Sequence, residues 1–321
     1  MNHNTWNLQT NQARNTRREF LKTSAKIGAT MALANFGIGT LLADENSKDT
    51  NAIPNLTLNN GVMMPIIGLG TYALREVDCQ RAVKDALSVG YRLFDSAQMY
   101  NNERDLGAAI NASLKNGYQR EELFITTKLS SGMGYKATKK SIAESLNKLK
   151  LDYVDLLLIH SPYAQSKEMY EAMEEAYAQG KIKALGISNF DTKAYLDFIK
   201  SCQIIPAVNQ VQTHVFFQRE ALQETMAKHG TIMQAWSPFA NGNNDFFKNP
   251  TLIQIGEKYG KTPAQVGLRY LVQRGINVIP KTSKKERMIE NINIFDFKLD
   301  LQDLSAIKKL DTNKSLFGWD A

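Results

Sequence analysis

The chain has 321 residues, of which 43% are hydrophobic and 22% charged, an ordinary composition for a folded protein. Its formal net charge is +7, but residues 1–43 hold five basic residues and one acidic residue, which leaves about +3 for the rest. So small and scattered a charge does not indicate a nucleic-acid partner. The two cysteines and four histidines show no zinc-binding spacing, so no metal site is expected.

The first segment, residues 1–43, reads as an export signal. Residues 17–22 have the order Arg-Arg-Glu-Phe-Leu-Lys, and residues 27–42 form an uncharged, weakly apolar run before Ala43. That run is shorter than the roughly 20 apolar residues of a membrane span. The segment resembles the twin-arginine (Tat) export signal of bacteria, which serves proteins that have already folded. The alternative is a basic amphipathic helix. Residues 44–55 look like a polar linker.

Short apolar runs follow the linker and alternate with helical segments. Residues 55–65 (NLTLNNGVMMP) predict a β-hairpin, because two apolar runs flank Asn59, Asn60 and Gly61. Eight further runs read as strands, at residues 66–72, 91–97, 123–129, 154–160, 184–189, 207–212, 231–238 and 277–283.

The segments between these runs have the pattern of amphipathic helices. In residues 137–149, Ile142, Leu146 and Leu149 recur at helical spacing. Thr262, followed by a proline, is typical of a helix start. Successive strand–helix units favour an α/β fold of the (β/α)8 TIM-barrel class. The alternative is a doubly wound sheet, but the first strand is not followed by the G-x-G-x-x-G loop that such a sheet would use.

Barrels of this class carry their chemistry at the carboxyl ends of the strands. Polar residues and one tryptophan stand at those ends in strand order: Asp95 with Tyr100 just beyond, Lys128, His160, Ser188, Asn189, Asn209, Gln210, Trp236, Ser237, Lys281, Thr282 and Ser283. We expect these side chains to meet at one rim of the barrel.

Four of these side chains suit proton transfer. Lys128 ends an apolar strand and needs a counter-charge, which Asp95 can supply. A cation beside Tyr100 is expected to lower the pKa of the phenol and make it a general acid or base near neutral pH. His160 can direct a substrate oxygen by a hydrogen bond. Each feature alone is more often structural, but together they predict a site for reducing a carbonyl group.

The segments that carry these residues resemble the aldo-keto reductase family, and they occur in the family's order. They read FDSAQMYNNE, ITTKL, LLIHSP, GISNF, VNQVQTH, WSPFA and VIPKTSKKERMIEN. The resemblance implies a (β/α)8 barrel over residues 56–321 with the hairpin closing its bottom. It also implies reversible hydride transfer from NADPH to aldehydes, ketones or sugar-derived carbonyls, with NADP+ as the oxidised cofactor.

The resemblance assigns a role to each of the four residues. Tyr100 becomes the proton donor, Lys128 paired with Asp95 tunes it, and His160 orients the carbonyl. The cofactor is implied to lie extended, without a Rossmann fold. The residues implied to hold it are Gly70, Thr71 and Tyr72 near the nicotinamide, Ser188, Asn189 and Gln210 at its carboxamide, Trp236 on its ring, Ser237 at the pyrophosphate, Lys281, Thr282, Ser283 and Arg287 at the 2′-phosphate, and Glu290 and Asn291 at the adenine.

The group at residues 281–287 decides the expected cofactor. Its cations and hydroxyls suit the 2′-phosphate of NADPH, so NADPH is favoured over NADH. The alternative for this group is a solvated basic turn, and the alternative for Trp236 is packing in the barrel core.

The chain departs from the family pattern at four places. Gln212 stands where many members have Glu, which is expected to change local hydrogen bonding, and Trp236 stands where Tyr is usual. The loop after the seventh strand and the tail after Asp311 are short, which suggests an open pocket as in bacterial members. Candidates for its lining are Tyr72, Phe246, Phe247 and Trp319.

Other interpretations stay open at this point. The chain could be an exported binding or accessory protein with a cofactor site and little turnover, or an enzyme that works mainly in the oxidative direction. We expect a monomer that acts on a small molecule, with no stable membrane association after signal removal. Its location is periplasmic or exported if the signal works and cytoplasmic if it does not, and free NADPH is not expected outside the cytoplasm.

Overall fold

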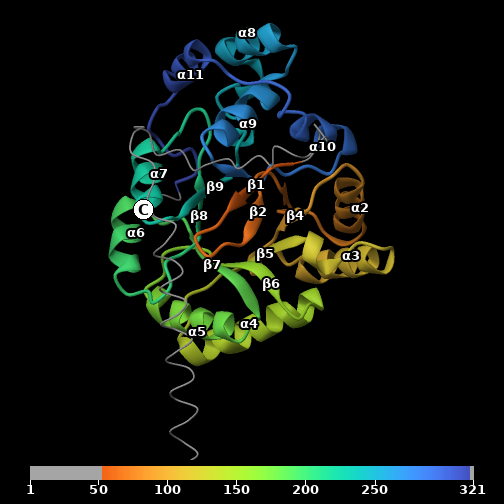
Figure 1. Ribbon diagram of the computed structural model, residues 1–321, viewed down its shortest axis with the longest axis vertical. Coiled ribbons are helices and arrows are strands. Elements are labelled where there is room, and N and C mark those ends of the chain that lie inside the picture. Colours follow the sequence, from red (N-terminus) through yellow and green to blue (C-terminus); the bar gives the residue numbers. More distant parts are fainter. Residues whose placement is uncertain (1–52, 319–321) are drawn as a thin grey trace, which may run out of the picture. The chain divides into compact units, whose positions relative to one another are not determined.

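The fold is seen in residues 53–318, which the computed structural model describes (Figure 1). The export signal predicted for residues 1–43 and most of the linker predicted for 44–55 lie outside the described residues. No helix within residues 53–318 has the length and apolarity to cross a membrane.

Eight parallel strands form one sheet, and each strand pairs with the next along the chain. They are β3 (Leu69–Gly70), β4 (Leu93–Asp95), β5 (Phe124–Leu129), β6 (Val154–Ile159), β7 (Ile182–Ser188), β8 (Val208–Gln212), β9 (Ile232–Trp236) and β10 (Asn277–Val278). All six residues of β5 and of β6 are buried, as expected for parallel strands covered on both faces.

The sheet closes on itself between its first and last strands. Gly68 N donates to Val278 O at 2.9 Å, and Val278 N donates to Ile66 O at 3.0 Å. At Gly70 the two backbones lie so close that a Cβ atom would be 2.7 Å from Ile279 O, so glycine is needed at this seam. The predicted (β/α)8 barrel is confirmed.

Helices surround the barrel (Figure 1). Single helices follow the strands from β3 to β8, namely α2 (Glu76–Ser88), α3 (Glu103–Lys115), α4 (Tyr135–Leu149), α5 (Ser166–Ala178), α6 (Thr192–Ile199) and α7 (Glu220–Ala227). Two helices, α8 (Pro250–Tyr259) and α9 (Pro263–Gln273), lie between β9 and β10, and α10 (Lys285–Ile292) and α11 (Leu301–Lys308) follow β10.

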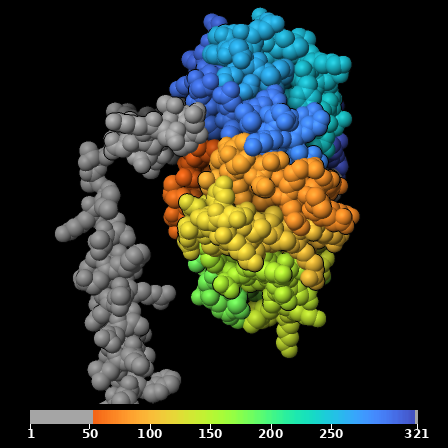
Figure 2. All heavy atoms as spheres, turned by 90° about the vertical axis from the view of Figure 1, so that its right-hand side faces the viewer, coloured from red at the N-terminus to blue at the C-terminus, as the bar shows by residue number. Residues whose placement is uncertain are grey.

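The sequence signals for individual helices are also confirmed. The segment predicted at 137–149 falls within α4. Thr262 is the N-cap of α9, where its side chain accepts from Gln265 N and Gln265 in turn accepts from Thr262 N. Helix α10 (blue) packs beside α2 (orange), which places the end of the barrel against its beginning (Figure 2).

The predicted hairpin consists of β1 (Asn55–Thr57) and β2 (Met63–Pro65), which pair antiparallel. Its turn is tied to the amino-terminal side of two barrel strands: Asn60 Nδ2 donates to Lys183 O at 2.8 Å and Asn59 Nδ2 donates to Ile205 O at 3.1 Å. Met64 is fully buried. The hairpin therefore covers the bottom of the barrel, opposite the rim where the strands end.

Candidate active site

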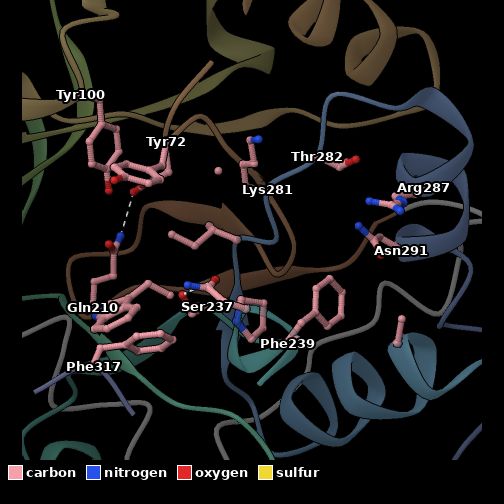
Figure 3. A pocket seen from close by; sticks show the side chains of 18 of the residues that line it. Tyr72, Tyr100, Gln210, Ser237, Phe239, Lys281, Thr282, Arg287, Asn291 and Phe317 are labelled. Carbon is pink, nitrogen blue, oxygen red and sulfur yellow. Dashed lines mark hydrogen bonds between the residues drawn. The ribbon is translucent and has the colours of Figure 1, made fainter. Parts of the chain in front are cut away.

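A cavity of about 830 Å³ lies at the carboxyl ends of the strands. Figure 3 shows Tyr100, Tyr72 and Gln210 at one end of it and Thr282, Arg287 and Asn291 at the other. The cavity extends between these two groups of residues. Its volume is in the range of pockets that bind cofactors and drug-sized ligands.

The charged centre of the site lies beneath the end of the cavity that Tyr100 lines. Lys128, at the end of β5, is completely buried and donates to Asp95 Oδ1 at 2.5 Å and to Ser96 O at 2.9 Å. Its Nζ also lies 3.4 Å from the hydroxyl oxygen of Tyr100, in the short helix η1 (Gln98–Tyr100). Gln210 Nε2 donates to Asp95 Oδ2 at 2.8 Å. Both carboxylate oxygens of Asp95 are thus paired.

The expected lowering of the Tyr100 pKa is wrong in direction. Burial raises the pKa of this phenol, and Lys128 opposes that rise without overcoming it. Burial alone would lower the pKa of Lys128, but Asp95 and Tyr100 outweigh burial and raise it. At neutral pH the site therefore holds a lysine cation beside a protonated phenol, the form that a proton donor needs.

His160 follows β6 and is a neutral imidazole. Burial, and secondarily the nearby charge of Lys128, lowers its pKa to about 3. Its Nδ1 lies 3.1 Å from Ser130 Oγ, and its ring lies edge-on to Tyr100 with centroids 5.9 Å apart. When the Ser130 hydroxyl donates to Nδ1, Nε2 carries the imidazole proton and is a donor.

Three predicted residues of the cavity wall are connected to one another. Asn189 Nδ2 donates to His160 O at 3.0 Å, and Trp236 Nε1 donates to Asn189 Oδ1 at 2.8 Å. Asn189 has a φ of 63°, a left-handed conformation that asparagine tolerates better than most residues. The indole of Trp236 is thereby held by a hydrogen bond on the wall of the cavity.

The structure brings together nearly all of the predicted site residues around the cavity. Lys128 lies beneath the cavity wall, and Ser283 is not on it. Thr71 is fully buried behind the wall, where its hydroxyl donates to Asp95 O at 2.8 Å. Phe246 is a core residue with no exposed surface, whereas Tyr72 and Phe247 do line the cavity. Trp319 lies outside the described residues.

Sequence reasoning missed part of the wall that comes from irregular segments. Phe239, Asn241 and Gly242 line the cavity from the loop after β9, and Phe317 lines it from the tail. The Phe317 ring packs on Trp236 with centroids 5.5 Å apart. No periodic pattern could have found these residues, although an aromatic residue just after WSP was a weak signal.

Gln212 connects this tail to the barrel. Its amide oxygen lies 2.7 Å from Ser315 Oγ, and its amide nitrogen lies 3.0 Å from Nε2 of His214. The residue is fully buried. Gln212, which stands where many family members have Glu, therefore affects the hydrogen bond that holds the tail.

The fold and the site define a (β/α)8-barrel enzyme whose ionisable groups are arranged for proton transfer. A model of the aldo/keto reductase family matches residues 66–312. The glyoxal reductase of Bacillus subtilis (strain 168) is 39% identical over 268 residues, which cover 83% of this chain and 95% of that protein. The chain therefore belongs to the aldo/keto reductase family, and it is an oxidoreductase.

Solved structures agree with this assignment. The aldo-keto reductase MGS-M4, from a Medee basin deep-sea metagenome library, is 40% identical with a TM-score of 0.79, over 82% of this chain and 97% of that one. A Bombyx mori aldo-keto reductase in complex with NADP is 32% identical with a TM-score of 0.77, over 82% of this chain and 94% of that one.

Acidification is expected to destabilise the fold through His160. The pKa of this imidazole is about 3 in the folded protein and near 6.5 when exposed, so between these values the unfolded chain binds a proton that the folded chain does not. The free energy of unfolding should therefore fall by up to about 1.4 kcal/mol per unit of pH lowered in this window.

Urea midpoints measured from pH 6.5 to 4.5 check this expectation. The His160→Gln variant should lose stability less steeply than the wild type, and the control His229→Gln, at an exposed histidine, should follow the wild type. Parallel curves for His160→Gln and the wild type would show that His160 is charged in the folded state.

Proposed function

We propose that this protein reduces the carbonyl group of small aldehydes and ketones with NADPH and catalyses the reverse reaction as well. The observation that carries the proposal is the buried Lys128–Asp95 ion pair directly behind the hydroxyl of Tyr100, at one end of the cavity. Membership of the aldo/keto reductase family supports it.

Tyr100 is the proton donor in this proposal. Its phenol is protonated at neutral pH, because the pKa of tyrosine is ordinarily about 10 and burial raises it further here. NADPH, when bound, supplies the hydride. As the new C–H bond forms at the carbonyl carbon, the carbonyl oxygen takes the proton of Tyr100. The phenolate that remains lies 3.4 Å from the ammonium of Lys128, which stabilises it. In the reverse direction the phenolate accepts a proton from the alcohol.

His160 orients the carbonyl. In the tautomer in which the Ser130 hydroxyl donates to Nδ1, the neutral imidazole presents its Nε2 proton, and a donor at this position aligns the carbonyl oxygen near Tyr100. Because the pKa of His160 is about 3, its proton is not lost or gained near neutral pH. The residue therefore positions the substrate and leaves the proton transfer to Tyr100.

The residues present fit NADPH. Gln210 lines the cavity, and no described residue donates to its amide oxygen, so this oxygen suits the N–H₂ of a nicotinamide carboxamide. Trp236 offers its indole to the ring and Ser237 lies near the expected pyrophosphate. Lys281, Thr282 and Arg287 suit the 2′-phosphate, and Glu290 and Asn291 suit the adenine. Ser188, Asn189, Gly70 and Tyr72 complete the nicotinamide end.

The open end of the cavity favours small, weakly recognised substrates. Tyr72, Met99 and Phe247 line the cavity and are about half exposed or more, with exposed fractions of 61%, 46% and 50%. Glyoxal and related α-oxoaldehydes are the first candidates, because the relative from Bacillus subtilis is a glyoxal reductase. Sugar-derived carbonyls belong in the same test. Action as a monomer stays a prediction.

The location of the enzyme forms a separate part of the proposal. The Tat-like signal at residues 1–43 and the linker at 44–55 would deliver a barrel at 56–321 that has already folded around its cofactor. The motif Arg17-Arg18 followed by Phe-Leu-Lys supports this route. If the signal is not used, the enzyme stays in the cytoplasm with its NADPH supply.

Removal of the Tyr100 hydroxyl is expected to abolish turnover. The Tyr100→Phe variant should lower kcat by about 10²–10⁴-fold, the usual contribution of general acid catalysis, while NADPH binds as in the wild type. The control Tyr118→Phe removes the hydroxyl of a tyrosine that does not line the cavity and should keep the wild-type activity. NADPH oxidation with aldehydes, ketones and ketoses measures both. Equal activity of Tyr100→Phe and the wild type would contradict the proposed role.

Arg287 is expected to set the preference for NADPH. Loss of a charge-assisted hydrogen bond to the 2′-phosphate should weaken NADPH binding about tenfold or more in Arg287→Ala, with NADH binding changed less than about twofold. Lys285→Ala, which removes a neighbouring cation away from the cavity wall, is the matched control. Fluorescence titration gives both dissociation constants. An equal loss for the two cofactors would place Arg287 elsewhere than at the 2′-phosphate.

The arginine pair is expected to direct export. In a bacterial host, the full chain should reach the fraction outside the cytoplasm, and replacing both Arg17 and Arg18 by Lys should keep it inside although the charge is unchanged. Arg14→Lys is the control and should be exported. Cell fractionation with an immunoblot measures the distribution. A wild-type chain that stays inside would contradict this part of the proposal and leave the reductase proposal intact.

A further inference from the structure

A chain of buried side-chain amides runs through the barrel from Asp95 to the hairpin. Gln210 Nε2 donates to Asp95 Oδ2 at 2.8 Å and also to Gln234 Oε1 at 2.6 Å. Gln234 Nε2 donates to Asn277 Oδ1 at 2.7 Å, and Asn277 Nδ2 donates to Pro65 O at 2.6 Å. None of the three amides has more than 1% of its surface exposed.

The sheet register explains why these residues meet. Gln210 pairs with Gln234 across β8 and β9, and Gln234 pairs with Asn277 across β9 and β10. The three side chains are therefore at the same level of the barrel. Interior layers of such barrels are dominated by branched apolar residues, so three consecutive amides are an unusual choice. A buried polar chain is favourable only when all of its members are satisfied.

The two groups at the ends of this series of amides, the Asp95 carboxylate and Pro65 O, can only accept hydrogen bonds. This fixes the direction of every amide between them. Pro65 O is a backbone carbonyl, so Asn277 must turn its N–H₂ toward it and its oxygen toward Gln234. Gln234 must then offer its N–H₂ to Asn277 and its oxygen to Gln210. At the other end Asp95 is ion-paired with Lys128, so Gln210 must also offer N–H to the carboxylate.

The series of amides therefore determines the orientation of the Gln210 amide. Both of its N–H groups are used, and its oxygen accepts from no residue that the structure describes. A flipped amide would place its oxygen against Asp95 Oδ2 and against Gln234 Oε1, two acceptors. Such buried acceptor–acceptor contacts are costly. Without the oxygen of Gln234, only the bond to Asp95 would oppose rotation of the amide.

We propose that Gln234 and Asn277 are positioning residues for the nicotinamide end of the site. They hold Gln210 so that its N–H₂ faces Asp95 while its oxygen is left for the carboxamide of the cofactor. The oxygen of Asn189, the other amide in this region, already accepts from Trp236, whereas the oxygen of Gln210 accepts from no residue that the structure describes. The inference rests on the proposed use of NADPH.

The test is a comparison of two cofactors in binding, without turnover. The 3-acetylpyridine analogue of NADP+ has a methyl group in place of the carboxamide N–H₂ and therefore cannot donate to Gln210. In the wild type its dissociation constant should exceed that of NADP+ by about threefold to tenfold, the worth of one neutral hydrogen bond. Quenching of tryptophan fluorescence or calorimetry gives both constants.

The Gln234→Met variant keeps the size of the side chain and removes the acceptor for Gln210. The ratio of the two dissociation constants should fall toward one in this variant. Asn277→Val removes the hydrogen bond to Pro65 O and should change the ratio in the same direction. This second variant keeps the test decisive if Gln234→Met does not fold. Thermal unfolding of each variant shows that it is folded before binding is measured.

Asn209→Leu is the matched control. Asn209 precedes Gln210 on β8 and is fully buried, but its amide donates to Phe190 O at 2.9 Å, outside the chain of amides. This variant should lose stability and keep the wild-type ratio. If Gln234→Met and Asn277→Val keep the wild-type ratio, the amide chain only packs the barrel and the inference is overturned. A wild type that does not bind NADP+ would instead overturn the proposed function.

Discussion

The buried ion pair between Lys128 and Asp95 is the interaction on which the rest of the site depends. A lysine with no exposed surface can stay charged only because a carboxylate lies 2.5 Å away, and the carboxylate is held in turn by Gln210. The barrel supplies these partners from separate strands at the rim. This pair also determines what Tyr100 can do, because the Lys128 cation lies beside the oxygen on which the phenolate charge would form.

Burial and charge act in opposite directions on the same phenol, and burial prevails. The nearby cation suggests a lowered pKa for Tyr100, yet the pKa is raised. A raised pKa keeps the proton in place until an oxygen that is becoming basic arrives, which suits a donor in carbonyl reduction. His160 is affected differently, because burial and Lys128 both lower its pKa and keep it neutral. One cation thus stabilises the charged form of one neighbour and the neutral form of another.

Much of this arrangement could be predicted from the sequence, because parallel strands bring their ends to one rim. Asp95, Lys128 and His160 stand at or near the ends of apolar runs, Gln210 lies within β8, and the parallel register of the strands brings these residues together. Thr71 could not be predicted in the same way, since its hydroxyl turns to the backbone of Asp95. The contact of Phe317 with Trp236 comes from the irregular tail, and the hydrogen bonds of Gln234 depend on side-chain direction inside the barrel. Neither leaves a periodic signal.

The hydrogen bond from Asn277 to Pro65 joins residues 212 positions apart in the chain. The acceptor belongs to the hairpin that begins the barrel, and the donor belongs to the last strand. A growing or truncated chain that lacks β10 has no such bond, so the Gln210 amide gains its full support only when the two ends of the barrel have met. Under the proposed role of Gln210, a site ready for the nicotinamide would require completed folding, which is the condition that an export route for folded proteins would have to sense.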